Sequence, residues 1–293
     1  MEASDRLAEQ FEGHRPQLRA VAYRMLGSLS EADDAVQEAW LRLGSVDSRH
    51  IDNLGAWLTT VVGRICLNML RSRKIRGEQP LGVHEPDPVV SRVGGGDPEH
   101  EALLGESVGL ALLVVLDTLT PAERLAFVLH DIFAVPFVEV AAILETSAGT
   151  VRQLGSRARR RVQEAPMPDA DLARQREVVD AFLAAARDGD FDGLVAVLDP
   201  DVVLRADGGP GRPSASAVIR GATTLAAQAI TFAQGAPFAR PALINGAAGF
   251  VVARGNRILS IMGFVARNGR IAAIDVLADP DRLSNLDLRE WVE

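Results

Sequence analysis

Residues 136–162 read PFVEVAAILETSAGTVRQLGSRARRRV, and this stretch decides how the first half of the chain folds. Apolar residues recur every three or four positions on both sides of a small-residue turn at 146–149, which predicts two helices. We expect the first helix to end near Glu145 and to pack its apolar face on the second. The expected contact residues are Val140, Ile143, Leu144, Val151, Leu154 and Ala158. The stretch therefore predicts a helix-turn-helix.

The second helix of this motif is strongly basic, although the 293-residue chain has a formal net charge of -8. Arginine and glutamine read base edges through paired hydrogen bonds, whereas hydroxyls and further arginines hold phosphates. We expect Arg152 and Gln153 to read bases and Ser147 or Thr150 to cap the helix. The candidate DNA contacts are Thr150, Arg152, Gln153, Ser156, Arg157, Arg159 and Arg160. A solvated basic helix in an ordinary helical hairpin would show the same pattern.

Around this motif the chain divides into several modules, because 293 residues exceed what one core usually supports. Helical spacing of apolar residues predicts all-α domains over 7–76 and 102–163. Segments rich in Pro, Gly and acids predict linkers over 77–101, which we expect to be flexible, and 164–173. Over 174–285, an amphipathic helix and then strand-like runs predict an α+β domain with a curved antiparallel sheet. Asn268-Gly269 is a hairpin signal within it.

The sole cysteine, Cys66, excludes an internal disulfide and lies in an apolar run, where we expect it to be buried. The N-terminal residues lack the apolar core of a signal peptide. The longest apolar run, 108–116, is too short for a membrane span, which needs about 20 residues. We therefore expect a cytoplasmic protein that does not contact the membrane.

Residues 22–43, AYRMLGSLSEADDAVQEAWLRL, predict a helix with one apolar and one acidic face. Val36, Ala39, Trp40 and Leu43 form the expected buried face. The acidic outer face comprises Asp33, Asp34, Gln37 and Glu38. DNA phosphates would repel such a face, so it favours a protein partner, although a merely solvated surface is the alternative.

Residues 53–78, NLGAWLTTVVGRICLNMLRSRKIRGE, combine a core stripe with a basic outer face. The stripe comprises Leu58, Val61, Val62, Ile65, Leu67 and Leu70. Trp57 could stack on a base or simply pack in the core. The polar outer residues are Arg64, Asn68, Arg71, Arg73, Lys74 and Arg76.

Four motifs, taken in this order and spacing, resemble the two conserved domains of bacterial extracytoplasmic-function (ECF) sigma factors, the promoter-recognition subunits of RNA polymerase. They are DDAVQEAWLRL, AWLTTVVGRICLNMLRSRKIR, LTPAERLAFVLHDIFAVPFVEVAAIL and GTVRQLGSRARRRV. The resemblance covers about residues 7–163. Agreement of four separate motifs is far more specific than a helix-turn-helix pattern alone.

This resemblance implies a role for each module. The helix with Asp33, Asp34, Gln37 and Glu38 would dock on the β′ clamp of core RNA polymerase, and the β flap is a second implied partner. The stretch Trp57–Arg76 would capture the minus-ten promoter element as a single strand, with arginines on the backbone and a pocket for a flipped base. The helix from Thr150 would read the minus-thirty-five element as duplex DNA.

Residues 174–285 resemble the SnoaL or NTF2-like fold, a cone with a cavity, as the stretch DAFLAAARDGDFDGLVAVLDPDVVLRADGG illustrates. A sigma factor with this extension is similar to the SigJ-type group, in which the extension contacts the sigma domains and their linker and regulates them in cis. The linker signature of that group has a tryptophan before a Leu-Pro-Glu-Pro run, whereas this chain has only LGVHEPDP (81–88). The implied regulatory contacts are Asp207, Gly208, Gly209, Asp279, Pro280, Asp281, Arg282 and Leu283.

Some SnoaL-like proteins are enzymes that use a His and Asp pair, but all five histidines here precede residue 166. Acid-base chemistry would fall to Asp207 or Asp275, which would need raised pKa values. Asp275 could instead pair with Arg205 or Arg254. We therefore expect no enzymatic activity, no metal and no cofactor, while an unidentified small ligand could enter the cone. The alternatives are a stand-alone DNA-binding regulator or ligand sensor, or a SnoaL-like isomerase or cyclase.

Overall fold

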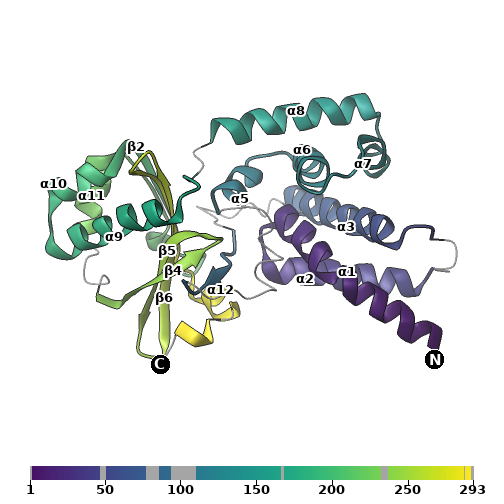
Figure 1. The fold of residues 1–293 in the computed structure, drawn as a ribbon, viewed down its shortest axis with the longest axis horizontal. Helices are drawn as coiled ribbons and strands as arrows, with labels where there is room; N and C mark the ends of the chain where they lie inside the picture. Colours follow the sequence, from purple (N-terminus) through teal and green to yellow (C-terminus); the bar gives the residue numbers. More distant parts are fainter. Residues whose placement is uncertain are drawn as a thin grey trace. The chain divides into compact units, whose positions relative to one another are not determined.

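The computed structural model divides the chain into two compact units, which Figure 1 shows and which we describe separately. Unit 1 comprises residues 1–79, 98–105 and 113–165, and unit 2 comprises 80–97, 106–112 and 166–293. The structure describes residues 2–46, 51–76, 86–93, 110–165, 168–231, 237–286 and 288–291.

Three long helices begin unit 1: α1 (Glu2–Leu26), α2 (Leu29–Gly44) and α3 (Leu54–Arg76). Ser28 caps α2, because its side chain accepts a hydrogen bond from the Glu31 N–H. The apolar face predicted for α2 is buried, and Trp40 is half-buried with its ring 4.9 Å from that of Phe11. Cys66 is also buried within α3, as expected.

The second helical set contains the predicted helix-turn-helix. Its elements are α5 (Leu110–Asp117), α6 (Pro121–Ala126), the π-helical turn η2 (Phe127–Ile132), α7 (Phe137–Leu144) and α8 (Ala148–Glu164). The first residues of α5 belong to unit 2 and the rest to unit 1. A capping box between Thr120 and Glu123 starts α6. Ser147 caps α8, and Val140, Ile143, Val151 and Ala158 are buried between α7 and α8. The other two predicted contact residues, Leu144 and Leu154, are half-buried, and the predicted helix-turn-helix is confirmed.

Two buried arginines join the helical sets within unit 1. Arg24 and Arg124 are 2% and 3% exposed. The Nε of Arg124 donates to the Arg24 carbonyl over 2.9 Å, while the Arg24 guanidinium lies over Phe133. Burial lowers the pKa of Arg24 to about 10. Because a buried charge is costly without such partners, these contacts specify how α1 and α6 pack in this unit.

Unit 2 packs helices on a seven-stranded sheet. Its described helices are α9 (Leu172–Asp188), α10 (Phe191–Val197), α11 (Ala222–Thr231) and α12 (Pro280–Asn285), with short 3-10 turns η3 (Pro213–Ala215) and η5 (Arg289–Trp291). Phe182 of α9 and Phe250 of the sheet both contact the Phe264 ring edge-on, with centroids 5.6 Å apart. These aromatic residues lie in the main core of the unit.

The sheet has the strand order β1-β4-β5-β6-β7-β2-β3. The strands are β1 (Val90–Ser91), β2 (Leu198–Asp207), β3 (Ala217–Arg220), β4 (Ala239–Ile244), β5 (Ala247–Arg254), β6 (Arg257–Arg267) and β7 (Arg270–Leu277). Asn268 and Gly269 have φ of 53° and 73°, so the predicted tight hairpin is confirmed. Pairs are antiparallel except β2 with β7, which is parallel and differs from the expected antiparallel sheet. The α+β domain predicted from the sequence is confirmed, with α9 and α10 before the sheet strands β2–β7 and α11 inserted between β3 and β4.

None of the helices in the described ranges is long and apolar enough to cross a membrane.

Candidate functional site

The acidic face predicted on α2 is exposed at Asp33, Asp34, Gln37 and Glu38. Two of its carboxylates have partners within the unit. Arg19 Nε donates to Asp33 over 2.6 Å, and Glu38 pairs with Arg42 one turn later. Leu41 is 64% exposed and lies one turn after Gln37, on the same side of the helix. Leu41 belongs to neither of the two faces predicted for this helix.

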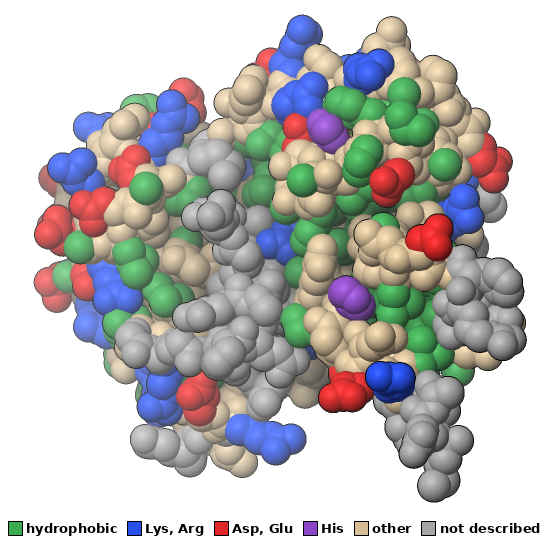
Figure 2. Space-filling view, turned by 45° about the vertical axis from the view of Figure 1, so that its right-hand side comes forward, with side chains coloured by type: hydrophobic (Ala, Val, Ile, Leu, Met, Phe, Trp, Pro, Cys, Tyr) green, Lys and Arg blue, Asp and Glu red, His purple; other side chains and the backbone are tan. Residues whose placement is uncertain are grey.

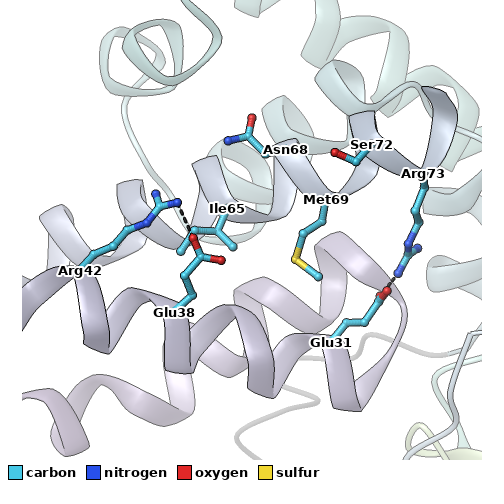
Figure 3. A pocket seen from close by; sticks show the side chains of 8 residues that line it. All are labelled: Glu31, Glu38, Arg42, Ile65, Asn68, Met69, Ser72 and Arg73. Atoms are coloured by element: carbon cyan, nitrogen blue, oxygen red, sulfur yellow. Dashed lines mark hydrogen bonds and ion pairs between the residues drawn. The ribbon is translucent and has the colours of Figure 1, made fainter. Parts of the chain in front are cut away.

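A pocket of about 230 Å³ lies between α2 and α3 (Figure 3). Glu31 and Glu38 line it from α2, and Met69 points from α3 toward α2. An ion pair stands at each end, Glu38 with Arg42 and Glu31 with Arg73 (Figure 3). The remaining lining residues are Ile65, Asn68 and Ser72. The pocket therefore combines residues from the acidic face of α2 and the polar face of α3.

The outer face of α3 is only partly available to a partner in this structure. Asn68 and Arg71 are exposed, whereas Trp57 is half-buried. Arg64 donates to the Ala142 carbonyl of α7 over 3.3 Å, and Arg73 pairs with Glu31. The side chains of Lys74 and Arg76, which belong to the same predicted set, lie outside the described residues.

On α8, the predicted DNA contacts form an exposed basic face, and in Figure 2 basic side chains gather at the top of the view, at the height of α8 in Figure 1. Arg159 differs from its neighbours because its guanidinium donates to Asp131 over 2.6 Å. The Arg152 guanidinium lies over the Phe137 ring, 5.4 Å from its centroid. The fully exposed members of the set are Thr150, Arg152, Gln153, Ser156, Arg157 and Arg160.

In unit 2, the two motifs expected to make regulatory contacts meet each other. Arg282 Nη1 donates to Asp207 over 2.6 Å, and Asp207 is 3% exposed. A side chain at Gly209, whose φ is +74°, would come within 2.3 Å of the Asp279 carboxyl group. Glycine is therefore required there by both its conformation and its close neighbour. Pro280 starts α12, Asp281 donates its N–H to Asp279, and Leu283 is buried.

The same arginine holds residue Asp87, which lies in the segment 86–93 between the two helical sets. Arg282 Nε and Nη2 donate to Asp87 Oδ1 over 3.0 and 2.5 Å. Next to it, Val89 donates its N–H to Asn245 Oδ1 over 3.0 Å and accepts the Asn245 N–H over 2.8 Å. Strand β1 then extends the sheet beside β4. This segment lies within the range predicted to be a flexible linker, most of which falls outside the described residues.

Asp87 and Asn245 were not among the predicted contacts. An Asn-Gly pair at 245–246 with positive φ at both residues is a turn signal that the sequence offered, while an acid between Pro86 and Pro88 carries no signal of its own.

Asp275 does not lie free in a cavity. Its side chain is 1% exposed, and Arg205 Nη1 donates to Oδ1 over 2.8 Å, while Oδ2 has no hydrogen-bond partner among the described residues. Pro86, Pro88 and Leu110 line a void of about 10 Å³ beside it. Burial raises the pKa of Asp275, and the Arg205 charge only partly offsets this. Of the two partners considered, Arg205 is the one in contact.

The described residues contain no group of three or more His, Cys, Asp or Glu side chains that could hold a metal ion. The structure does not test whether an unidentified small ligand enters the cone, so this stays a prediction.

Comparison with known proteins places both helical sets among sigma regions. Residues 10–75 match the family Sigma-70 region 2, and residues 109–162 match Sigma-70, region 4. The chain is 39% identical over 298 residues to the ECF RNA polymerase sigma factor SigJ of Mycobacterium tuberculosis, covering 96% of this chain and 94% of that protein. It is also 39% identical over 215 residues to the probable ECF sigma factor SigI of that species, covering 72% and 73%. The crystal structure of SigJ superposes with a TM-score of 0.79 at 36% identity, over 96% of this chain and 99% of that one.

Proposed function

The chain belongs to the family of ECF RNA polymerase sigma factors, and on this basis we propose that it is regulated in cis by unit 2, which holds the segment linking its two sigma regions. Membership makes the protein a non-enzymatic transcription initiation factor that binds core RNA polymerase and promoter DNA. The alternatives of a stand-alone regulator and of a cyclase-like enzyme are therefore set aside.

For the polymerase contact, we assign the exposed stripe of α2 to the β′ clamp. Asp34 and Gln37 supply polar groups, and Leu41 adds an apolar contact at the end of the stripe. Asp33 and Glu38 belong to the same surface but must exchange their present partners, Arg19 and Arg42, for the clamp. The contact of the second sigma region with the β flap rests on the family resemblance alone.

For the promoter, α3 takes the minus-ten element and α8 the minus-thirty-five element. Asn68 and Arg71 are exposed on α3, and Asn68 lines the pocket of about 230 Å³ in Figure 3, which we assign to the flipped base. On α8, Arg152 and Gln153 are the base readers, and Arg157 and Arg160 are phosphate contacts. Arg159 reaches phosphate only if it leaves Asp131.

The observation that carries the regulatory proposal is that Arg282 forms ion pairs with two carboxylates at once. Its guanidinium binds both Asp207 and Asp87, the latter in the linking segment. Residues 86–93 also pair with β4, and Val89 exchanges two hydrogen bonds with the side-chain oxygen and the backbone N–H of Asn245. Forked charge-assisted hydrogen bonds of this kind are strong and geometrically specific. Fixing this segment restricts how the two sigma regions can be placed on polymerase and promoter.

Transcription from a promoter library tests both levels of the proposal. Purified core polymerase is combined with the full chain or with a chain ending at Glu164, and core affinity, promoter choice and transcript yield are compared. We expect both chains to bind core polymerase and to differ in yield or promoter choice. Equal affinity, choice and yield would overturn cis regulation, whereas failure of either chain to bind core polymerase would overturn the assigned polymerase surface.

A further inference from the structure

Phe137, the first residue of α7, is the centre of a group of planar side chains beside the DNA-facing helix. The His130 ring stacks on the Phe137 ring with centroids 3.5 Å apart and an interplanar angle of 28°. The Arg152 guanidinium from α8 lies over the same ring, 5.4 Å from its centroid. Phe137 thus contacts both the turn before it and the exposed face of α8.

The position of the Phe137 ring is fixed by its surroundings. It is half-buried, and His130 beside it is held by a 2.9 Å hydrogen bond between Nδ1 and the Val135 carbonyl. That bond closes a short turn in which Ala134 has a φ of 55°. A Cβ atom at Gly155 would lie 4.0 Å from the ring, so α8 passes close to it. The ring is therefore a rigid platform.

A guanidinium on an aromatic face keeps its N–H donors free, because they lie in its own plane and not along the stacking direction. Stacking also removes rotamer freedom before a ligand arrives, which lowers the entropy lost on binding. Arg152 is exposed while its guanidinium lies over the ring, so its donors can reach a partner. A bidentate contact to guanine O6 and N7 needs this arrangement of a fixed fork and free donors.

We propose that Phe137 is a positioning residue for promoter specificity: its ring holds the Arg152 guanidinium in the orientation that reads a guanine in the minus-thirty-five element. The inference rests on the proposed reading of that element by α8, and it adds a residue outside the DNA-facing helix. Asp131 acts on Arg159 in a parallel way but through an ion pair, so the segment 130–137 orients two arginines of α8.

The test selects minus-thirty-five sequences from a randomised library with core polymerase and full-length chain. Phe137→Leu removes the ring but keeps an apolar side chain, and Phe137→Tyr keeps the ring. Arg152→Lys retains the charge but loses the planar fork, so it reports on base reading by residue 152 without disturbing α7. Val138→Ala is the matched control, because Val138 is the neighbouring residue and is 71% exposed.

We expect Phe137→Leu and Arg152→Lys to lose discrimination at the same single base pair, by roughly tenfold. Phe137→Tyr and Val138→Ala should retain the wild-type preference, and all variants should keep their core affinity and salt dependence. A wild-type preference in Phe137→Leu alongside a changed one in Arg152→Lys would overturn the positioning role. If Phe137→Leu does not fold, Phe137→Tyr losing the preference would overturn it. An unchanged preference in Arg152→Lys would instead contradict the proposed base reading by α8.

Discussion

Arg282 contacts two carboxylates at once, and we propose a regulatory role for one of these contacts. Its side chain is 18% exposed and pairs with the buried carboxylate of Asp207, while its remaining donors bind Asp87. Removing one partner of a buried charge pair is far more destabilising than the pair is stabilising. A change at Asp87 is therefore the milder probe, because it leaves the pair of Arg282 with Asp207 in place.

Cys66 gives a residue-scale prediction about reactivity. Burial raises the pKa of its thiol to about 12, so the reactive thiolate is scarce at neutral pH. Because Cys66 is the sole cysteine, labelling with a thiol reagent reports on this site alone. We expect the native protein to label only as fast as it unfolds, with full labelling in denaturant. Rapid stoichiometric labelling of the folded chain would contradict the described burial.

Asp275 gives a pH-dependent prediction. Its pKa is raised in the folded state, so between its usual value and the raised one the folded protein binds the proton that the unfolded chain releases. This contribution to stability is present at low pH and is lost as pH rises through that window. Measured by denaturant unfolding, the wild type should gain stability relative to Asp275→Asn as pH falls from neutral toward the usual aspartate pKa of 3.8. A difference that stays constant with pH would refute the raised pKa.

At the level of elements, the sequence predicted the helix faces, the cap and the hairpin, because each depends on residues close together in the chain. The faces of α2 and α7, the cap residue Ser147 and the Asn268-Gly269 hairpin follow from spacing and turn chemistry. Strand β1 has only two residues and forms because it pairs with β4 and the preceding residue hydrogen-bonds to Asn245. No local sequence pattern could therefore indicate it. The parallel pairing of β2 with β7 is likewise set by the tertiary fold.

The cap of α8 gives an element-scale prediction. Ser147 Oγ accepts the Thr150 N–H over 3.1 Å, which satisfies one of the unpaired donors at the start of the DNA-facing helix. Ser147→Ala should cost about 1 kcal/mol of stability and weaken promoter binding, whereas Ser147→Asp should retain the cap. Thermal unfolding monitored by circular dichroism measures the first effect. Equal stability of all three proteins would argue against the cap.

The candidate site shows the same contrast between pattern and tertiary contact. Exposure of the acidic stripe and of the basic face on α8 followed from helical periodicity. The partners of Arg159, Arg73 and Arg152 did not, because each comes from a different element of the unit. Packing of the helices therefore determines which arginines contact another side chain of the protein. A sequence pattern indicates only that these arginines face outward.

For the whole molecule, we propose that unit 2 acts on transcription through the linking segment and not through a catalytic or ligand-driven step. Asp207 and Asp279, the acids of its two motifs, are engaged by Arg282 and by the start of α12. The motifs thus build the surface that receives residues 86–93. Through the hydrogen bond of Arg282 to Asp87, these motifs contact the segment that lies between the two sigma regions in the sequence.

The most direct test is transcript yield by reconstituted holoenzyme carrying Asp87→Asn, beside the wild type, the chain ending at Glu164 and the control Asp180→Asn on the exposed side of α9. Asp87→Asn removes the negative charge that strengthens the Arg282 hydrogen bonds to this residue, which are worth about 1.5–3 kcal/mol when charged, and it leaves the pair of Arg282 with Asp207 in place. The account predicts that its yield moves from the wild-type value in the direction of the shortened chain, while Asp180→Asn matches the wild type. A wild-type yield from Asp87→Asn, together with a changed yield from the shortened chain, would contradict it.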